Sequence, residues 1–323
     1  MLKPACKIEI GAATFDSSVD QRIISASIDL DIDLFSDSFQ VVLTPCTRAS
    51  AIKIGDPVVI ELGYEGAFSK VLTGSVDDLE FKISQVTVKG LCSTTLLTRL
   101  RINQVYQKQA AGAIVKDLAG KVGIPIKSVE DGLNFPVYYV DDSKDAYTHM
   151  KELAMKCGFD LYMNEDGKLV FKKYSRRPAK QFKYGVNIME AEVHERMPLA
   201  ACLKVLGESP SSSKGADTAH WISKRAVVGV AGDGSPLVVE EDPTVRDKDT
   251  ADKVAAALLQ SMSYTLSGTL KVLGNAGISL GDTIEFSDMP DSRMNGEFEA
   301  RCVSHSFSKK DGFVSAIGWR KWG

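Results

Sequence analysis

The sequence predicts a mainly β protein of the α+β type, in which two antiparallel β-domains flank a small α/β domain. Three observations lead to this prediction. Apolar and polar residues alternate along many short segments in the first and last parts of the chain, which is typical of half-buried strands. The middle of the chain carries apolar residues at helical spacing instead. A motif from the first part returns near the end, which indicates two similar domains.

The first part of the chain consists of short β-branched runs separated by polar turns, at residues 23–28, 39–43 and 58–62. A longer alternation follows at 76–90, where Leu79 and Phe81 are interleaved with Glu80 and Lys82. This pattern predicts a long hairpin with one buried and one wet face.

The middle part contains two predicted helices and a hairpin. Apolar residues recur at every fourth position between Ile114 and Val122, which predicts a helix that begins near Ala110. A second amphipathic stripe predicts a helix from about 144 to 157. Two alternating segments at 159–171 then meet at an Asp-Gly pair, and the glycine supplies the positive φ that a tight hairpin turn needs.

Strands return from about residue 181, interrupted by a polar Ser-rich loop at 209–215 and a third predicted helix at about 250–264. We therefore predict three domains: a first β-domain at 1–95, an inserted α/β domain at 96–180, and a second β-domain with one helix at 181–323.

An internal repeat links the two β-domains. Gly55-Asp56 and Gly281-Asp282 each follow an apolar residue and each precede a strand. A long hairpin comes later in both domains, at 76–90 and at 303–318. Any two β-hairpins look somewhat alike, and this is the alternative interpretation. The shared order of turn, strand and hairpin favours two similar domains.

Composition excludes several classes of protein. A net charge of -3 argues against sequence-specific nucleic-acid binding, which usually needs a basic domain. No window approaches the roughly 18 apolar residues of a membrane span, and the first residues lack a signal-peptide pattern. The six cysteines are scattered, without a His at ligand spacing, so we expect reduced thiols, no metal site and no cofactor.

Sequence signatures of common enzymes are absent. The chain has no GxSxG, HExxH, GxxxxGK[ST] or strand-linked GxGxxG motif. Of the four histidines, at 149, 194, 220 and 305, His149 and His305 have no evident third partner for a catalytic triad. We expect that the protein is not an enzyme and has no catalytic residues.

Several segments together resemble the baseplate hub proteins of contractile tails. Residues 106–115 are similar to a helix start in that family, and residues 145–159 with 163–171 resemble its helix and Gly-Phe hairpin. Gly281-Asp282 and the segments 295–298, 303–307 and 312–313 resemble its closing strands. The family includes the late control gene D proteins of tailed phages and the hub part of the valine-glycine repeat spike proteins of type VI secretion.

The resemblance implies two tube-type β-barrels with an inserted α/β domain, and a homotrimer with pseudo-sixfold symmetry. Such a hub joins the hexameric tail tube to the central spike. The implied partners are the tube protein, a spike protein on a separate chain, baseplate wedge proteins and, as a further candidate, a tape measure protein. The implied location is the host cytoplasm during assembly and the baseplate of the particle afterwards, in a phage, a bacteriocin or an extracellular injection system.

Seven residues are candidates for the tube interface or the channel lining. They are the residues of the two Gly-Asp turns and the polar outward residues of the long hairpins: Gly55, Asp56, Gly281, Asp282, Glu80, Lys82 and Lys309. The alternative interpretation is that these hairpins face bulk solvent. Two other functions stay open, a tail-associated peptidoglycan hydrolase and a tail-tip glycan-binding protein. Tyr138, Tyr139 and Tyr162 are the aromatic candidates for glycan binding.

Overall fold

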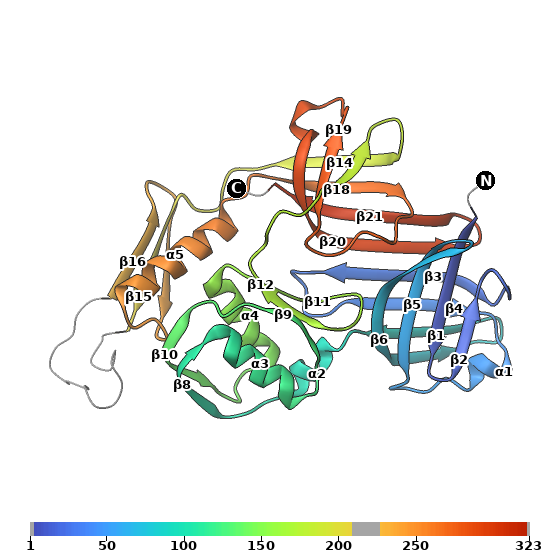
Figure 1. The fold of residues 1–323 in the computed structure, drawn as a ribbon, viewed down its shortest axis with the longest axis horizontal. Helices are drawn as coiled ribbons and strands as arrows, with labels where there is room; N and C mark the ends of the chain where they lie inside the picture. Colours follow the sequence, from blue (N-terminus) through green and yellow to red (C-terminus); the bar gives the residue numbers. More distant parts are fainter. Residues whose placement is uncertain (1–2, 209–226, 322–323) are drawn as a thin grey trace.

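A computed structural model describes residues 3–208 and 227–321. The predicted loop at 209–215 and His220 lie outside the described residues. The protein is mainly β, as the alternation predicts, and most of its strands belong to one 13-stranded sheet. Smaller sheets and three longer helices occupy the other side of the molecule (Figure 1).

The first part of the chain forms seven strands of the large sheet and a short helix. They are β1 (Pro4–Ile10), β2 (Ala13–Asp16), β3 (Ile23–Asp31), β4 (Ser38–Leu43), α1 (Thr47–Ser50), β5 (Pro57–Tyr64), β6 (Ala67–Phe81) and β7 (Val86–Leu91). The long strand β6 pairs first with β5 and then with β7, and its register shifts between Val76 and Asp78. Strands β1, β2 and β5 thereby lie across β3 and β4 (Figure 1), with the core between the two layers.

The last part of the chain repeats this arrangement. Its elements are β13 (Lys180–Lys183), β14 (Ile188–Glu195), β18 (Leu266–Leu273), β19 (Thr283–Ser287), the 3₁₀ turn η3 (Ser292–Met294), β20 (Gly296–Ser308) and β21 (Gly312–Arg320). Strand β20 pairs first with β19 and then with β21, with a register shift between Ala300 and Cys302. Strand β20 also pairs with β3, so the two β-units share one sheet and one hydrophobic core.

The predicted helices and hairpin of the middle part are confirmed. This part contains α2 (Thr94–Arg99), β8 (Gln104–Ala110), α3 (Ala111–Lys121), β9 (Ile126–Val129), β10 (Asn134–Val140), α4 (Ala146–Cys157), β11 (Asp160–Met163) and β12 (Leu169–Lys172). The Asp145 carboxylate caps α4 by accepting a hydrogen bond from the Thr148 N–H, and Gly158 ends the helix at φ 65°. These elements enclose a separate hydrophobic cluster.

A second small unit lies between β14 and β18 in the sequence. It consists of β15 (Cys202–Gly207), β16 (Val227–Gly232), β17 (Leu237–Asp242) and α5 (Lys248–Met262). The predicted third helix is confirmed, but it packs in a hydrophobic cluster with β15 and β16, apart from the core of the large sheet. The sequence does not predict this separation, because the strands before and after the helix have the same alternating pattern. The division at 95 and 180 stays a prediction.

No helix within 3–208 or 227–321 is both long and apolar enough to cross a membrane.

Candidate functional site

The two Gly-Asp turns have the same hydrogen bonds. In the first turn, the Gly55 N–H donates to the Val76 carbonyl oxygen over 2.8 Å, and the Val76 N–H donates to the Asp56 carbonyl oxygen over 3.0 Å. In the second turn, Gly281, Ala300 and Asp282 make the corresponding bonds, both 2.9 Å long. Each turn therefore fastens the start of a strand to the register shift in the long strand, β6 or β20.

The aspartates of the two turns also act alike. The Asp56 carboxylate accepts a hydrogen bond from the Lys53 N–H, and the Asp282 carboxylate accepts one from the Ser279 N–H, each 2.8 Å long. Asp282 is buried and forms an ion pair with Lys180 over 2.6 Å. The repeat seen in the sequence is thus a repeat of turn geometry, and the Asp282 carboxylate is engaged within its own chain.

Both turn glycines adopt a left-handed backbone, with φ of 89° at Gly55 and 70° at Gly281. We expect Gly55→Ala to lower the free energy of unfolding by about 1–2 kcal/mol. The substitution isolates the backbone cost, because a Cβ at Gly55 would meet no atom within 4 Å. Gly281→Ala should cost at least as much, since its Cβ would lie 3.3 Å from the Tyr162 hydroxyl.

The matched control for the turn glycines is Gly120→Ala. Gly120 lies in helix α3, has no positive φ and has free space for a methyl group. This substitution should stabilise the protein by about 0.5–1 kcal/mol. Urea unfolding measures all three variants, and a stabilising effect of Gly55→Ala would contradict the role of the turn.

The hairpin residues lie on the outer face of the large sheet. Glu80 and Lys82 are exposed and form an ion pair with an N–O distance of 2.8 Å. Lys309 lies in the turn between β20 and β21, where its ammonium donates to the Gln21 carbonyl oxygen over 2.7 Å. The structure does not gather the seven candidates in one place: four form the two turns and three lie on or beside the long hairpins.

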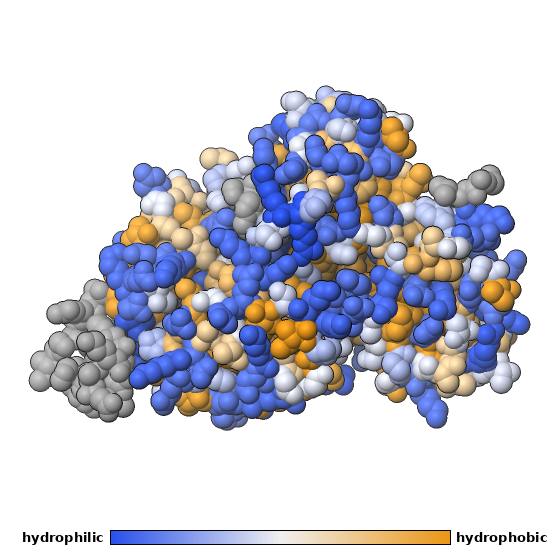
Figure 2. All heavy atoms as spheres, viewed as in Figure 1, coloured by the Kyte–Doolittle hydropathy of each residue, from blue (hydrophilic) through white to orange (hydrophobic). Residues whose placement is uncertain are grey.

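The outer face around these hairpins is polar across neighbouring strands. Side chains that alternate with the buried positions are serines and aspartates on β3, such as Ser27 and Asp29, and serines on β20, such as Ser304 and Ser306. Figure 2 shows hydrophilic and hydrophobic residues interspersed over the face of the molecule that it displays.

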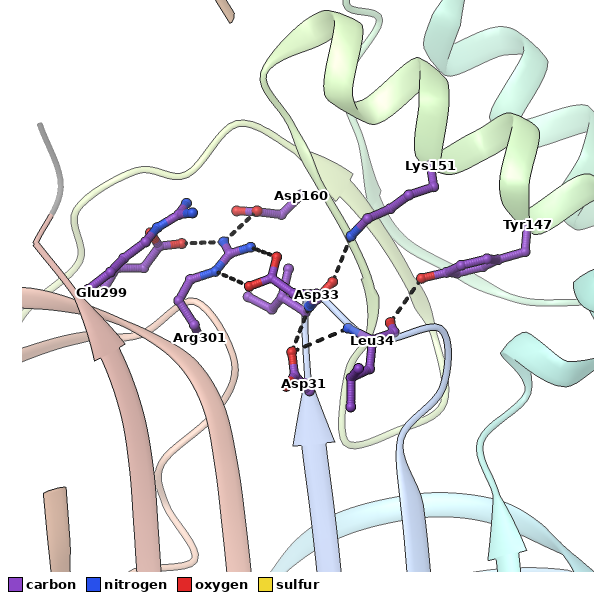
Figure 3. Close-up of polar contacts among 10 residues, drawn as sticks. Asp31, Asp33, Leu34, Tyr147, Lys151, Asp160, Glu299 and Arg301 are labelled. Carbon is purple, nitrogen blue, oxygen red and sulfur yellow. Dashed lines mark hydrogen bonds and ion pairs between the residues drawn. The ribbon is translucent and has the colours of Figure 1, made fainter. Parts of the chain in front are cut away.

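A polar junction centred on a buried arginine joins the β-units to the α/β unit, and no sequence pattern predicts it. Arg301 of β20 is 8% exposed and lies among three carboxylates (Figure 3). Its guanidinium donates to Asp33 after β3 at 2.5 Å, to Asp160 of β11 at 2.6 Å and to Glu299 of β20 at 2.8 Å. Arg320 of β21 also donates to Glu299 over 2.8 Å.

Burial and charge act against each other in this junction. Burial raises the pKa of the Asp33 carboxyl, but the hydrogen bond and charge of Arg301 outweigh it and hold that pKa below its ordinary value. At Glu299, which is fully buried, burial prevails over Arg301 and Arg320 and raises the pKa. The carboxylates therefore depend on the arginines for compensation of their charge.

Helix α4 holds the loop after β3 from the other side of this junction. The Lys151 ammonium donates to the Ile32 carbonyl oxygen over 2.8 Å, and the Tyr147 hydroxyl donates to the Leu34 carbonyl oxygen over 3.0 Å (Figure 3). The loop is thereby fixed between the two units, while the Leu34 side chain remains exposed.

The described histidines do not form a catalytic arrangement. His305 and Ser315 are both fully buried, and the His305 Nδ1 contacts the Ser315 Oγ at 2.9 Å. Because both side chains are buried, no substrate reaches this pair. His149 is buried in α4 and its Nε2 contacts the Asp141 carbonyl oxygen at 3.0 Å. His194 is exposed on β14. Within the described ranges, no group of three or more His, Cys, Asp or Glu residues is arranged to hold a metal ion.

A pocket of about 690 Å³ lies between α4 and the segment that follows β17. Two charged residues of this pocket, Lys156 and Asp242, form an ion pair with an N–O distance of 3.0 Å and so neutralise each other. The tyrosines suggested for glycan binding do not form a shared platform: Tyr138 and Tyr162 are buried in two different clusters, and Tyr139 is exposed.

The mainly β fold of this chain is similar to the folds of solved tail proteins. A 43 kDa tail protein of prophage MuSo2 from Shewanella oneidensis superposes with a TM-score of 0.74 at 15% identity, covering 99% of this chain and 98% of that one. A tail protein from Neisseria meningitidis MC58 superposes with a TM-score of 0.71 at 14% identity, over 99% and 96% of the two chains.

A third solved structure is an E. coli component of the type VI secretion system, described as structurally similar to the bacteriophage T4 tail proteins gp27 and gp5. It superposes with a TM-score of 0.63 at 10% identity, over 98% of this chain and 77% of that one. At these identities the likeness shows a common fold. Searches of protein-family models and of curated proteins by sequence found no match.

Proposed function

We propose that this chain is a structural protein of a contractile tail or a related injection particle, and that it acts as the baseplate hub. In this role it is a homotrimeric adaptor between a hexameric tail tube and a central spike formed by another protein. Baseplate wedge proteins and a tape measure protein are further partners in the proposal. Assembly takes place in the host cytoplasm, and the finished hub is part of the particle.

The observation that carries the proposal is the duplication of the β-unit within one sheet. Gly-Asp turns, partner switches and register shifts correspond between β5–β7 and β19–β21. A chain with two like units lets three copies present six similar surfaces, which matches a sixfold tube. The fold shared with two tail proteins and a type VI secretion component supports the same role.

The polar outer face of the long hairpins supports a position along the channel. Glu80, Lys82 and Lys309 are exposed there, as a water-filled channel needs. In this proposal the Gly55-Asp56 and Gly281-Asp282 turns take equivalent heights around the ring. The role is mechanical, and the burial of the His305–Ser315 pair gives no support to a peptidoglycan hydrolase.

Electron microscopy of particles tests this function. We expect threefold density for this chain at the tip of the tube, and a mass of three chains when it is co-expressed with its spike protein. Particles that form normally without the chain, or a dimer or hexamer of it, would refute the hub. Hydrolysis of peptidoglycan by the purified protein would favour the enzyme instead.

A further inference from the structure

The two β-units differ at one strand edge. In the second unit, β20 is flanked by β21 on one side, and on its other side its second half pairs with β3. In the first unit, the second half of β6 pairs with β7, and no described strand pairs with its other edge. Such an edge offers unpaired backbone N–H and C=O groups to another strand.

The free edge of β6 has a counterpart on β14. Strand β14 pairs with β18 as β3 pairs with β4, and the register shifts between Ile188 and Glu190 as it does between Ile23 and Ser25. Strand β14 is therefore the equivalent of β3, the strand that covers β20. The other edge of β14 pairs with no strand in the described part of the chain.

Large apolar side chains are exposed at the edge of β6, whereas their equivalents on β20 are buried. Phe81 is 55% exposed, whereas His305, at the equivalent position of β20, is 0% exposed under its neighbour Ile28 on β3. Ile83, at the tip of the β6 hairpin, is fully exposed, whereas its equivalent Phe307 is buried. Large apolar side chains at a bare sheet edge favour a protein partner.

We propose that the second half of β6 pairs antiparallel with β14 of a second copy of this chain, in the register that β20 uses with β3. Cys302 lies opposite Asp31 within the chain. The same offset places Asp78 opposite Arg196 of the second copy, Glu80 opposite its His194 and Lys82 opposite its Glu192. Phe81 then lies opposite Val193 of that copy and is covered as His305 is.

Charge complementarity supports this register. At two of the three outward positions the charges are opposite, because Asp78 meets Arg196 and Lys82 meets Glu192, while Glu80 meets the imidazole of His194. Opposite charges directly across two strands stabilise their pairing, and like charges oppose it. A slip by two residues in one direction would set Glu80 against Glu192, and a slip by two in the other would separate Lys82 from Glu192 and set Asp78 against Pro198.

The contact is head to tail, because each chain contributes one β6 edge and one β14 edge. Repeated contacts of this kind close into a ring when the rotation allows it. Within the chain, the pairing of β20 with β3 joins the two units. The inference rests on the proposed ring of three copies and adds the strands and residues that close it.

Disulfide trapping in assembled particles tests the register. In the variant Glu80→Cys/His194→Cys, the two positions would have the Cα separation of about 5 Å that a disulfide accepts. We expect mild oxidation to link most chains into dimers and closed trimers on denaturing gels. The control Asp78→Cys/Glu190→Cys uses the same strands, but its positions are six residues out of register and should not link.

Charge reversal provides a second measurement that does not depend on oxidation. Lys82→Glu should weaken assembly roughly threefold for each contact, and Lys82→Glu/Glu192→Lys should restore it. A threefold ring without trapping of the Glu80→Cys/His194→Cys pair, or with equal trapping of the control, would overturn this interface and leave the hub intact. Absence of any ring would overturn the hub itself.

Discussion

Replacing Arg301 by leucine is expected to lower the free energy of unfolding by about 3–5 kcal/mol. The side chain is 10% exposed and compensates Glu299, which has no exposed surface, together with Asp160 and Asp33. Leucine leaves Glu299 and Asp160, whose side chains are 0% and 14% exposed, without their main cation, whereas the Asp33 side chain is exposed to solvent. The loss should be largest for the contact between the β-units and the α/β unit, because the three carboxylates come from β20, β11 and the loop after β3.

The control for Arg301 is Arg293→Leu. Arg293 also forms ion pairs, with Asp291 and Glu195, but its side chain is 52% exposed. We expect a much smaller change for this variant, because solvent screens an exposed ion pair. Urea unfolding followed by circular dichroism measures both. If Arg301→Leu and Arg293→Leu had equal free energies of unfolding, the ion pairs of Arg301 would not stabilise the fold more than an exposed ion pair does, and the prediction would be wrong. Arg301→Lys should be intermediate, since it keeps the charge but loses the forked geometry.

A second large effect is the loss of stability at low pH that the buried His305 is expected to cause. Burial lowers the pKa of this imidazole from its ordinary value of 6.5 to about 4. The folded protein therefore binds fewer protons here than the unfolded chain between pH 4 and 6.5. The stability that comes from the neutral ring is fully present above pH 6.5 and is lost as the pH falls toward 4. Across this pH window the free energy of unfolding decreases by about 3 kcal/mol.

The comparison that isolates this effect is between the wild-type protein and His305→Gln. The stability of the wild type relative to the variant should decrease by about 3 kcal/mol between pH 7 and pH 4. Burial raises the pKa of Asp37 to about 7, so this carboxyl gives stability the opposite pH dependence. Asp37 is present in both proteins, so its contribution cancels in the comparison. The matched control is His194→Gln, which removes a histidine whose side chain is exposed. Parallel pH curves for wild type and His305→Gln would contradict the prediction.

Local patterns were sufficient to predict most elements. Alternation of residues such as Leu79 and Glu80 predicts strands because successive side chains point to opposite faces of a sheet. The helical stripe from Ile114 to Val122 predicts α3, which begins one residue after Ala110. The Gly-Asp pairs were recognisable because only a turn with positive φ strongly favours glycine there.

The polar junction could not be predicted from the sequence. Asp33, Asp160 and Arg301 are separated by more than 100 residues from one another along the chain, and each is an ordinary charged residue in its local context. Their contact results from three elements that meet, and that meeting depends on the whole topology. The separate packing of α5 could not be predicted either, because the apolar stripe of a helix does not specify which sheet it packs against.

By itself, the sequence determined that the protein is mainly β, where its three longer helices lie and that its β-unit is duplicated, because these follow from periodicity and turn chemistry within short windows. Only the tertiary structure decided that β20 joins β3 while, among the described residues, the equivalent edges of β6 and β14 have no strand neighbour. Strand pairing is a long-range interaction, and Ser304 on β20 pairs with Asp29 on β3 across most of the chain. Hence the exposure of Phe81, and with it the proposed contact between copies, is a property of the folded sheet.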